Sequence, residues 1–320
     1  TKFNPDGSDL LWASYLGGSS NDAPHSLITD NDGNLYLYGS SNSIDFPCSQ
    51  NAYDNSISGG YDIIITQLSS DGTTILGSSY VGGGANDGIN IINYNYDDSY
   101  RGEIYLDYEN NIYISSFSSS NDFPTSVNAY QSSIAGGQDA VVFKLNNNLS
   151  NLIWSTYLGS TGNDAGYGLR VNENLETYVT GTAADGFPMA NIANVNSFNG
   201  GEYDGFVVKI NEIGTDLLTS RYFGSSSLDQ SFFIDIDVDG DVYISGQNLG
   251  NIPITPGYYG NDNSSQFLAK FDQNLDQVIW QTTIGSGNQF SHDFVPTAFM
   301  VDVCKGIYFS GHGGLNSIPN

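Results

Sequence analysis

Short hydrophobic runs recur along the whole chain and alternate with polar turns. The runs hold five to eight residues rich in Ile, Val, Tyr and Phe, and the turns are rich in Gly, Asn, Asp and Pro. Runs of this length and composition predict β-strands. No run combines a sustained helical period with capping residues, which a helix would need. The pattern therefore predicts an all-β protein.

One strand with a central tyrosine occurs five times. An Asp or Asn stands six residues before each tyrosine, and successive tyrosines are 77, 65, 65 and 65 residues apart. A fixed period of this kind indicates a repeat architecture. The five tyrosines are Tyr36, Tyr113, Tyr178, Tyr243 and Tyr308.

Three more motifs keep a constant order within each unit. A motif such as Tyr157-Leu158-Gly159 precedes the tyrosine strand, a pair such as Phe123-Pro124 follows it, and a strand ending near a lysine such as Lys144 comes last. Four strands repeated around an axis predict a β-propeller, because sheets stacked face to face bury both of their faces. A linear β-solenoid is the alternative, although its coils are usually much shorter.

We expect residues 1–320 to form a single β-propeller domain of four-stranded antiparallel blades. The start of the chain, Thr1-Lys2-Phe3-Asn4, matches the end of a third strand, and the last unit stops before its own third strand. Residues 1–9 are therefore expected to complete the last blade of a five-bladed ring, unless the chain is part of a larger propeller. The expected units lie near 10–73, 74–150, 151–215, 216–276 and 277–320.

The unit resembles the SBBP repeat, the seven-bladed β-propeller repeat of bacterial exported proteins. The resemblance rests on motifs such as Trp154-Ser155-Thr156-Tyr157-Leu158-Gly159 and Asp239-Gly240-Asp241-Val242-Tyr243-Ile244. It implies a propeller on secreted or cell-surface proteins of Bacteroidetes, which often leave the cell through the type IX secretion system and its translocon. It also implies adhesion or gliding motility, and it supplies no catalytic residues. The family name counts seven blades, whereas five units occur here.

The charge of the chain narrows the choice of partners. The net charge is −27, from 35 acids against 8 bases. Nucleic acid and anionic membrane surfaces are therefore excluded, because both are bound through clustered Lys and Arg. No stretch is long and apolar enough to predict membrane insertion. A cation, a neutral ligand such as a glycan, or a basic protein remains, and acidity also serves solubility alone.

The second unit contains twelve more residues than the others, near 93–101. Insertions in repeats fall in loops, often on the binding face. Tyr94, Tyr96 and Tyr100 make this segment a candidate binding loop, since tyrosine offers a large contact area at low entropic cost. The alternative is a plain extension of a hairpin.

Four alternating acids, Asp235, Asp237, Asp239 and Asp241, form a candidate calcium site. Oxygen-rich loops of this kind bind Ca²⁺. The position at which an EF-hand-like loop has its bidentate Glu is Gly246 here, so a tight turn at Asp239-Gly240 is the competing interpretation.

The remaining candidates favour structural roles. In four of the five units an acid follows the glycine of the Tyr-x-Gly motif by five residues, and these acids are expected to stabilise turns. His292-Asp293 resembles a base with its orienting partner, but no nucleophile motif accompanies it. His25 and His292 lie in roughly equivalent loops of the first and fifth units, which leaves a metal pair as an alternative; His312 is the third histidine. Cys48 and Cys304 are far apart in sequence, and their pairing is left open. The acids are Asp22, Asp87, Asp164 and Asp229.

The sequence thus predicts a non-catalytic binding or adhesion propeller, secreted or displayed on a bacterial surface, with a glycan or protein ligand. A structural spacer or exported cargo domain without a ligand is the second reading. A hydrolase or lyase acting on polysaccharide is the third, and would need two convergent carboxylates.

Overall fold

The regular structure consists of β-strands. The computed structural model describes residues 1–92, 99–190, 197–288 and 294–313, and no helix among them could cross a membrane. Sixteen strands form four antiparallel sheets of four, which we call blades 1 to 4. Blade 1 contains β3 (Asp22–Thr29), β4 (Leu35–Ser41), β5 (Asp62–Leu68) and β6 (Ile75–Val81), and blade 2 contains β7 (Glu103–Leu106), β8 (Ile112–Ser118), β9 (Asp139–Leu145) and β10 (Leu152–Leu158). Blade 3 contains β11 (Ala165–Val171), β12 (Thr177–Ala183), β13 (Asp204–Ile210) and β14 (Leu217–Phe223). Blade 4 contains β15 (Asp229–Ile236), β16 (Val242–Asn248), β17 (Gln266–Phe271) and β18 (Val278–Ile284).

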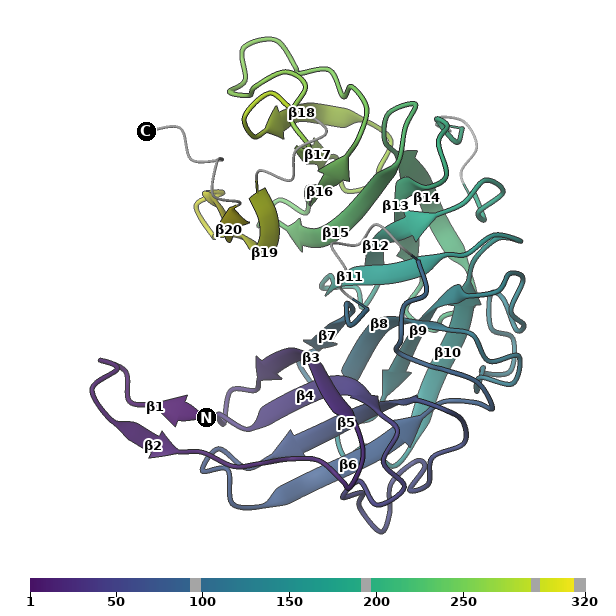
Figure 1. The fold of residues 1–320 in the computed structure, drawn as a ribbon, viewed down its shortest axis with the longest axis vertical. Helices are drawn as coiled ribbons and strands as arrows, with labels where there is room; N and C mark the ends of the chain where they lie inside the picture. Colours follow the sequence, from purple (N-terminus) through teal and green to yellow (C-terminus); the bar gives the residue numbers. More distant parts are fainter. Residues whose placement is uncertain (93–98, 191–196, 289–293, 314–320) are drawn as a thin grey trace.

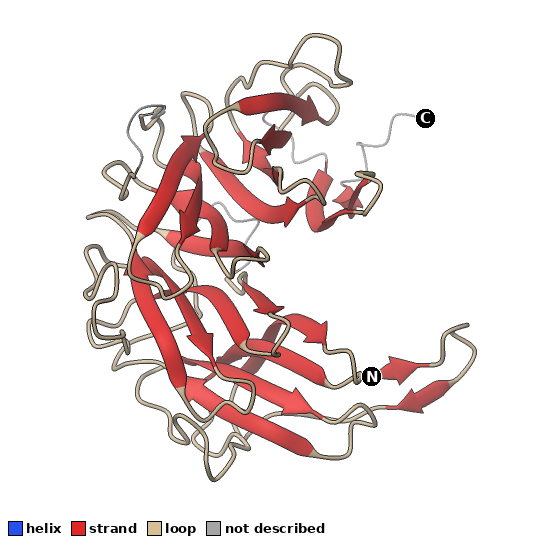
Figure 2. Ribbon diagram, turned by 180° about the vertical axis from the view of Figure 1, so that it is seen from behind, coloured by secondary structure: helices blue, strands red, loops and turns tan. Residues whose placement is uncertain are grey.

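The blades stand side by side around a common axis and form an open arc (Figures 1 and 2). Two hairpins lie at its opposite ends. They are the N-terminal hairpin, β1 (Lys2–Phe3) with β2 (Leu10–Trp12), and the C-terminal hairpin, β19 (Phe294–Val301) with β20 (Ile307–Gly313). The predicted all-β propeller of four-stranded antiparallel blades is therefore confirmed.

The described residues do not close into a five-bladed ring. In the described part of the chain, each terminal hairpin forms a two-stranded sheet of its own, and neither pairs with the other. Residues 1–9 consequently do not complete the last blade, because the two hairpins are separated by the opening of the arc (Figure 1). Strand pairing requires neighbouring strands to lie about 5 Å apart.

The repeat units and the blades are offset by one strand. The fourth strand of each blade, for example β6 or β10, lies beyond the unit boundary expected from the sequence. The boundary falls in the turn between the third and fourth strands. Motif spacing fixes the period of a repeat but gives no reason to begin the unit at one strand rather than another.

The core lies between the blades. One cluster of buried side chains joins blades 1 and 2, a second joins blades 2 and 3, and a third joins blades 3 and 4. Trp154 of β10 is 2% exposed, and its ring leaves no room for a Cβ on Gly214, which has a φ of +72° in a turn of blade 3. Blades 2 and 3 therefore bury both of their faces against neighbouring blades.

In blades 1 to 3, a tyrosine of the fourth strand joins two of the sequence motifs, whereas Thr283 occupies this position in blade 4. The Tyr157 hydroxyl donates to the carbonyl of Ser120 at 2.5 Å and accepts from the Phe123 N–H at 3.1 Å. Tyr222 makes the equivalent bonds with Ala184 and Phe187, at 2.7 and 2.8 Å. The Tyr-x-Gly and Phe-Pro motifs recur together because this contact fixes the fourth strand to the loop after the second.

We expect Trp154→Ala to lower the free energy of unfolding by about 3–5 kcal/mol, because it removes a large buried ring between two blades. Ile153→Ala, at the exposed neighbouring position of the same strand, should cost less than about 1 kcal/mol. Chemical denaturation of both variants measures the difference. Equal losses would show that the seam between blades 2 and 3 is not a main source of stability.

Candidate ligand-binding site

The first strands of the blades converge on the axis of the arc. The strands β3, β7, β11, β15 and β19 contact one another in that order. They surround a cavity of about 360 Å³, which we call the axial pocket. Its lining is aromatic with a few charged groups, the composition typical of small-ligand sites. The lining includes His25, Tyr100, Arg101, Arg170, Phe232 and Phe299.

The end of the inserted segment lies in this pocket. Tyr100 is 42% exposed, and its ring centroid is 5.5 Å from that of His25. The guanidinium of Arg101 lies 4.1 Å from the ring centroid of Phe232, a cation–π contact. Tyr94 and Tyr96, the other predicted binding residues, lie outside the described residues. The structure thus places Tyr100 at the axis of the arc.

His25 contributes a neutral imidazole to the pocket wall. Burial lowers the pKa of His25 to about 3, so the ring is uncharged near neutral pH. Nε2 lies 3.1 Å from the Ser40 hydroxyl, while Nδ1 is buried with no hydrogen-bond partner in the described structure. The ring packs edge-on against Tyr38. His292, its proposed metal-binding companion, lies outside the described residues, and His312 is exposed on β20.

Arg170 links three blades at the inner end of the pocket. Its Nε donates to Asp235 of blade 4 at 3.0 Å, and its Nη1 donates to the Glu103 carboxylate of blade 2. Glu103 also accepts from the Leu169 N–H at 2.9 Å. Arg170 lies between the axial pocket and a second, more acidic cavity of about 480 Å³. Sequence analysis did not predict this triad, because Asp235 and Glu103 are 65 and 67 residues from Arg170 and the three share no motif.

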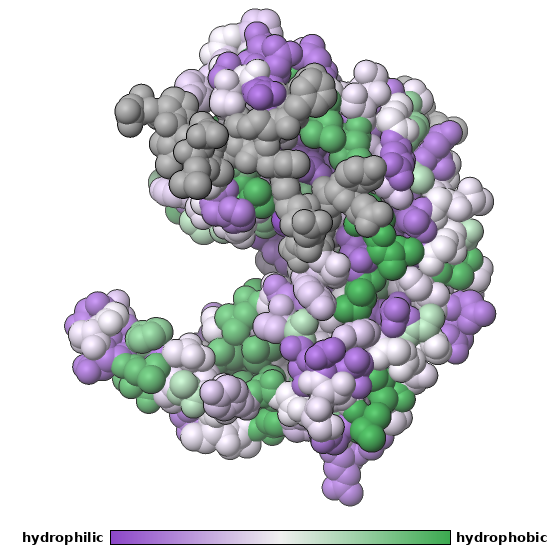
Figure 3. Space-filling model, viewed as in Figure 1, coloured by the Kyte–Doolittle hydropathy of each residue, from purple (hydrophilic) through white to green (hydrophobic). Residues whose placement is uncertain are grey.

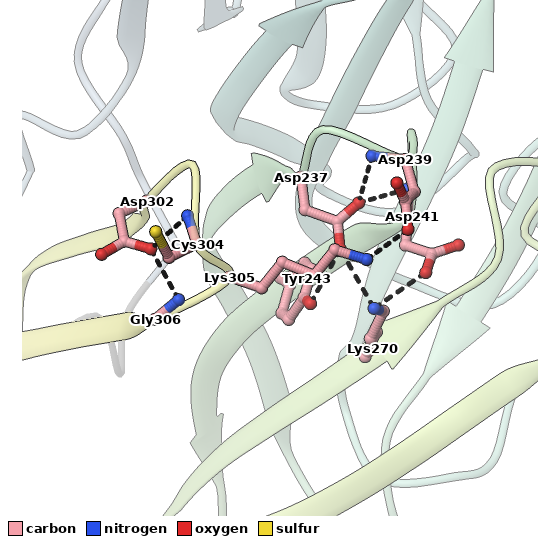
Figure 4. A network of polar contacts seen from close by, with 9 residues as sticks. All are labelled: Asp237, Asp239, Asp241, Tyr243, Lys270, Asp302, Cys304, Lys305 and Gly306. Carbon is pink, nitrogen blue, oxygen red and sulfur yellow. Dashed lines mark hydrogen bonds and ion pairs between the residues drawn. The ribbon is translucent and has the colours of Figure 1, made fainter.

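At the predicted calcium site, the ammonium groups of Lys270 and Lys305 contact the carboxylates (Figure 4). The Lys270 ammonium lies 3.0 Å from Asp237 and 2.8 Å from Asp241. Asp237 also accepts from the Tyr243 hydroxyl at 3.0 Å and from two backbone N–H groups of its own turn. The tight turn is therefore the interpretation that the geometry matches.

The other two acids of the run point to different partners. Asp235 binds Arg170, and Asp239 accepts a hydrogen bond from Lys305 of the C-terminal hairpin. Among the described residues, no group of three or more His, Cys, Asp or Glu side chains surrounds a common point. The structure does not bring the four carboxylates together as a calcium site, since each is neutralised by a base that is distant in sequence.

The recurring acids close the turns after the Tyr-x-Gly motif, as expected. Asp87 accepts from the Gly83 N–H at 2.7 Å, and Asp164 and Asp229 accept from the equivalent serine N–H groups at 2.6 Å. Burial raises the pKa of Asp164 to about 7 and that of Asp229 to about 8. Asp204, at the start of β13, is raised to about 7 for the same reason.

The two cysteines do not form a disulfide. Cys48 is half-buried in the loop between β4 and β5, and Cys304 is exposed in the turn of the C-terminal hairpin. Both are free thiols, so the stability of the fold comes from packing and hydrogen bonds.

Four-stranded sheets arranged around one axis, with a pocket at that axis, identify the chain as a β-propeller. Residues 11–47 match the family model described as SBBP, beta-propeller repeat. The matched segment lies within the first repeat unit and runs from β2 through the Phe46-Pro47 motif. No curated protein matches the chain.

Solved structures similar to the chain share little sequence with it. A protein of unknown function from Dyadobacter fermentans DSM 18053 has a TM-score of 0.48 and 11% identity, over 93% of this chain and 81% of that one. An exo-beta-1,3-galactanase from Clostridium thermocellum has a TM-score of 0.34 and 11% identity, over 79% and 50%. A luciferin-regenerating enzyme has a TM-score of 0.34 and 10% identity, over 94% of both. None of the three supplies a function for this chain.

Replacing Arg170 should destabilise the arc. Arg170→Met leaves Glu103 and Asp235 as two mostly buried carboxylates without their shared cation, so we expect a loss of about 3 kcal/mol. Adding Glu103→Gln and Asp235→Asn should recover most of that loss. Denaturant titration of both proteins tests the triad, and a single variant as stable as the wild type would contradict it.

The buried carboxyl groups predict that mild acid stabilises the fold. Their folded-state pKa values lie above the unfolded value of about 4, so the folded state holds protons more tightly. Their contribution is complete below about pH 4 and is lost as the pH rises through 7 to 8. The melting temperature should therefore rise by several degrees from pH 8 to pH 5.

Asp229→Asn should flatten this dependence, because the amide oxygen still accepts the Ser225 N–H but does not titrate. Asp262→Asn, at an exposed position, should leave the dependence unchanged. A melting temperature that falls between pH 8 and pH 5 would contradict the prediction.

Proposed function

We propose that this chain is a non-catalytic recognition propeller whose axial pocket binds part of a glycan or protein ligand. The observation that carries the proposal is the position of Tyr100 and Arg101. The one unit with an inserted segment brings these two residues to the axis, against Phe232 of blade 4. Repeat proteins often vary a single unit in this way to build a binding face.

The chemistry of the pocket suits binding. Tyr100, which is 42% exposed, provides a flat apolar surface, and the buried rings of Phe232 and Phe299 form part of the wall. The guanidinium groups provide hydrogen-bond donors that orient a ligand. Tyrosine loses little conformational entropy when a ligand orders it. A polar ligand with one apolar face, such as a sugar ring or a peptide side chain, matches this lining.

Two features support a non-catalytic role. Glu103 is the one acid among the described residues that line the axial pocket, and it is held by Arg170. A glycosidase instead needs two carboxyl groups that face the same bond. His25 has a pKa of about 3 and is therefore too weak a base for general acid–base work near neutral pH.

We further propose that the protein is secreted or displayed on a bacterial cell surface and serves adhesion, with gliding motility as the setting. The support is the repeat itself, since residues 11–47 match the SBBP repeat. Export through the type IX secretion system, with contacts to its translocon, belongs to the same proposal. The low charged fraction, 13%, and the acidic surface are compatible with an extracellular setting.

A binding screen tests the proposal. Wild-type protein is tested against glycan and peptide arrays, together with Tyr100→Ala and Tyr108→Ala. Tyr108 is an exposed tyrosine of the same blade, outside the pocket, and serves as the matched control. We expect Tyr100→Ala to weaken binding about tenfold or more and Tyr108→Ala to leave it unchanged.

Other outcomes would favour the alternatives. Binding that survives Tyr100→Ala would move the site away from the axial pocket. Wild-type protein that binds nothing would favour a structural spacer or exported cargo domain. Release of shortened sugar chains from a polysaccharide ligand would favour the hydrolase or lyase.

A further inference from the structure

Two acids meet where blade 3 packs against blade 4. Asp204 begins β13 and Asp229 begins β15, and these two strands are in contact (Figure 1). The Asp229 N–H donates to the carbonyl of Tyr203 at 2.9 Å, which holds the backbones of the two acids side by side. A Cβ on Gly205 would stand only 3.2 Å from that of Ser231, so the strands pack tightly at this point. Both acids are fully buried.

Each of the two carboxylates has one oxygen with a donor and one oxygen without. Asp204 Oδ2 accepts from the Asn199 N–H at 2.5 Å. Asp229 Oδ2 accepts from the N–H and the hydroxyl of Ser225, at 2.6 and 2.9 Å. Oδ1 of each acid is buried and has no hydrogen-bond partner in the described structure. No lysine or arginine among the described residues forms an ion pair with either acid, although an uncompensated buried charge is costly.

A buried amide adds a third oxygen to this interface. Asn248 lies directly opposite Asp229 in the pairing of β15 with β16, so the two side chains lie on the same face of the sheet. The amide nitrogen of Asn248 donates to the Gly250 carbonyl at 2.9 Å, which leaves the oxygen end for Asp229. Asn248 is fully buried, and its Oδ1 has no partner within the described part of the chain. The interface thus contains three buried oxygens that accept hydrogen bonds and receive none.

The equivalent pair of acids between blades 2 and 3 is satisfied by donors of the protein itself. Asp139 Oδ2 accepts from Gln131 Nε2 at 2.8 Å, and its Oδ1 accepts from the Gly136 N–H at 3.1 Å. Asp164 Oδ1 accepts from the Ala184 N–H at 2.9 Å. The repeat can therefore bury two such acids without leaving an oxygen unpaired, and the interface between blades 3 and 4 departs from that arrangement.

The interface between blades 1 and 2 is intermediate. Asp62 and Asp87 also have one oxygen each without a hydrogen-bond partner in the described structure. The residue opposite Asp87 is Ser118, however, whose hydroxyl can donate, whereas Asn248 presents an acceptor. Among the three interfaces between the described blades, only that between blades 3 and 4 combines an unpaired carboxylate pair with an amide oxygen.

We propose that a hard divalent cation binds between blades 3 and 4, held by the Oδ1 atoms of Asp204, Asp229 and Asn248. Carboxylate and amide oxygens are the ligands that Ca²⁺ prefers, and Ca²⁺ accepts them in an irregular arrangement. Two positive charges match the two carboxylates, so the ion removes the cost of burying them. The site is distinct from the acidic run Asp235 to Asp241, whose carboxylates contact basic side chains.

Calcium titration of cation-free protein tests the site. Hydrophilic residues are spread over the visible face of the arc (Figure 3), so weak binding of cations at the surface is expected as well. Salt at about 0.15 M screens exposed charges and affects a buried site much less. After treatment with a chelator, calorimetry in this salt should show a single Ca²⁺ that binds saturably. Wild-type protein without saturable binding would overturn the proposal.

Bound Ca²⁺ should also raise the melting temperature, because the ion binds the folded state and not the unfolded chain. Protons and the cation compete for the same oxygens. The pH dependence predicted above therefore belongs to protein kept in a chelator, and saturating Ca²⁺ should weaken it. A melting temperature that Ca²⁺ leaves unchanged would contradict the site.

Two variants locate the ion. Asn248→Ser should weaken Ca²⁺ binding about tenfold or more, because the serine hydroxyl replaces an acceptor by a donor to Asp229. Asp204→Asn should weaken binding at least as much, since it removes one of the two charges. The matched change Asp139→Asn, at the equivalent position between blades 2 and 3, should leave the Ca²⁺ affinity unchanged. Melting in a chelator verifies that each variant is folded. Folded Asn248→Ser and Asp204→Asn proteins that bind Ca²⁺ as tightly as the wild type would overturn the proposal.

Discussion

The structure depends on packing between sheets that are apolar on both faces. Strands such as β8 and β12 are buried along their whole length, so a single blade in water would expose two hydrophobic surfaces. At about 25 cal/mol per Å² of apolar surface, leaving even one face open is costly. Placing blades face to face around an axis solves this problem for every blade except those at the ends. The wide interfaces between blades, with Trp154 and its equivalents, follow from this constraint.

The same arrangement determines where chemistry can occur. Each blade turns its first strand to the axis, so residues from different repeat units meet there although they are far apart in sequence. Arg170 shows the consequence most clearly, because it neutralises acids of blades 2 and 4 from its place on blade 3. The chain has only eight basic residues, and two of its arginines line the axial pocket. Arg170 thus links neighbouring blades and also lines the axial pocket.

Local patterns in the sequence were sufficient for the fold. Strand length, the tyrosine period and the turn acids such as Asp164 predict four-stranded blades, because all of these depend on contacts within one unit. The candidate site was harder to predict from the sequence. The run Asp235 to Asp241 resembles a cation loop until Lys270 and Lys305 are seen beside it, and these lysines are distant in sequence. The burial of His25 and the ion pairs of Arg170 depend on residues of neighbouring blades. A motif within one unit contains no information about these contacts. Tyr100 was found because an insertion interrupts the period.

The offset between repeat unit and blade affects how such a chain can change its length in evolution. A duplicated stretch of one period would end in the turn between the third and fourth strands. It would contribute its fourth strand to the blade before it and its first three strands to the next. Every new blade would then contain strands from two successive copies of the unit, so no boundary between copies would coincide with an interface between blades. Gain or loss of whole periods therefore alters the curvature and the number of blades while it preserves every seam.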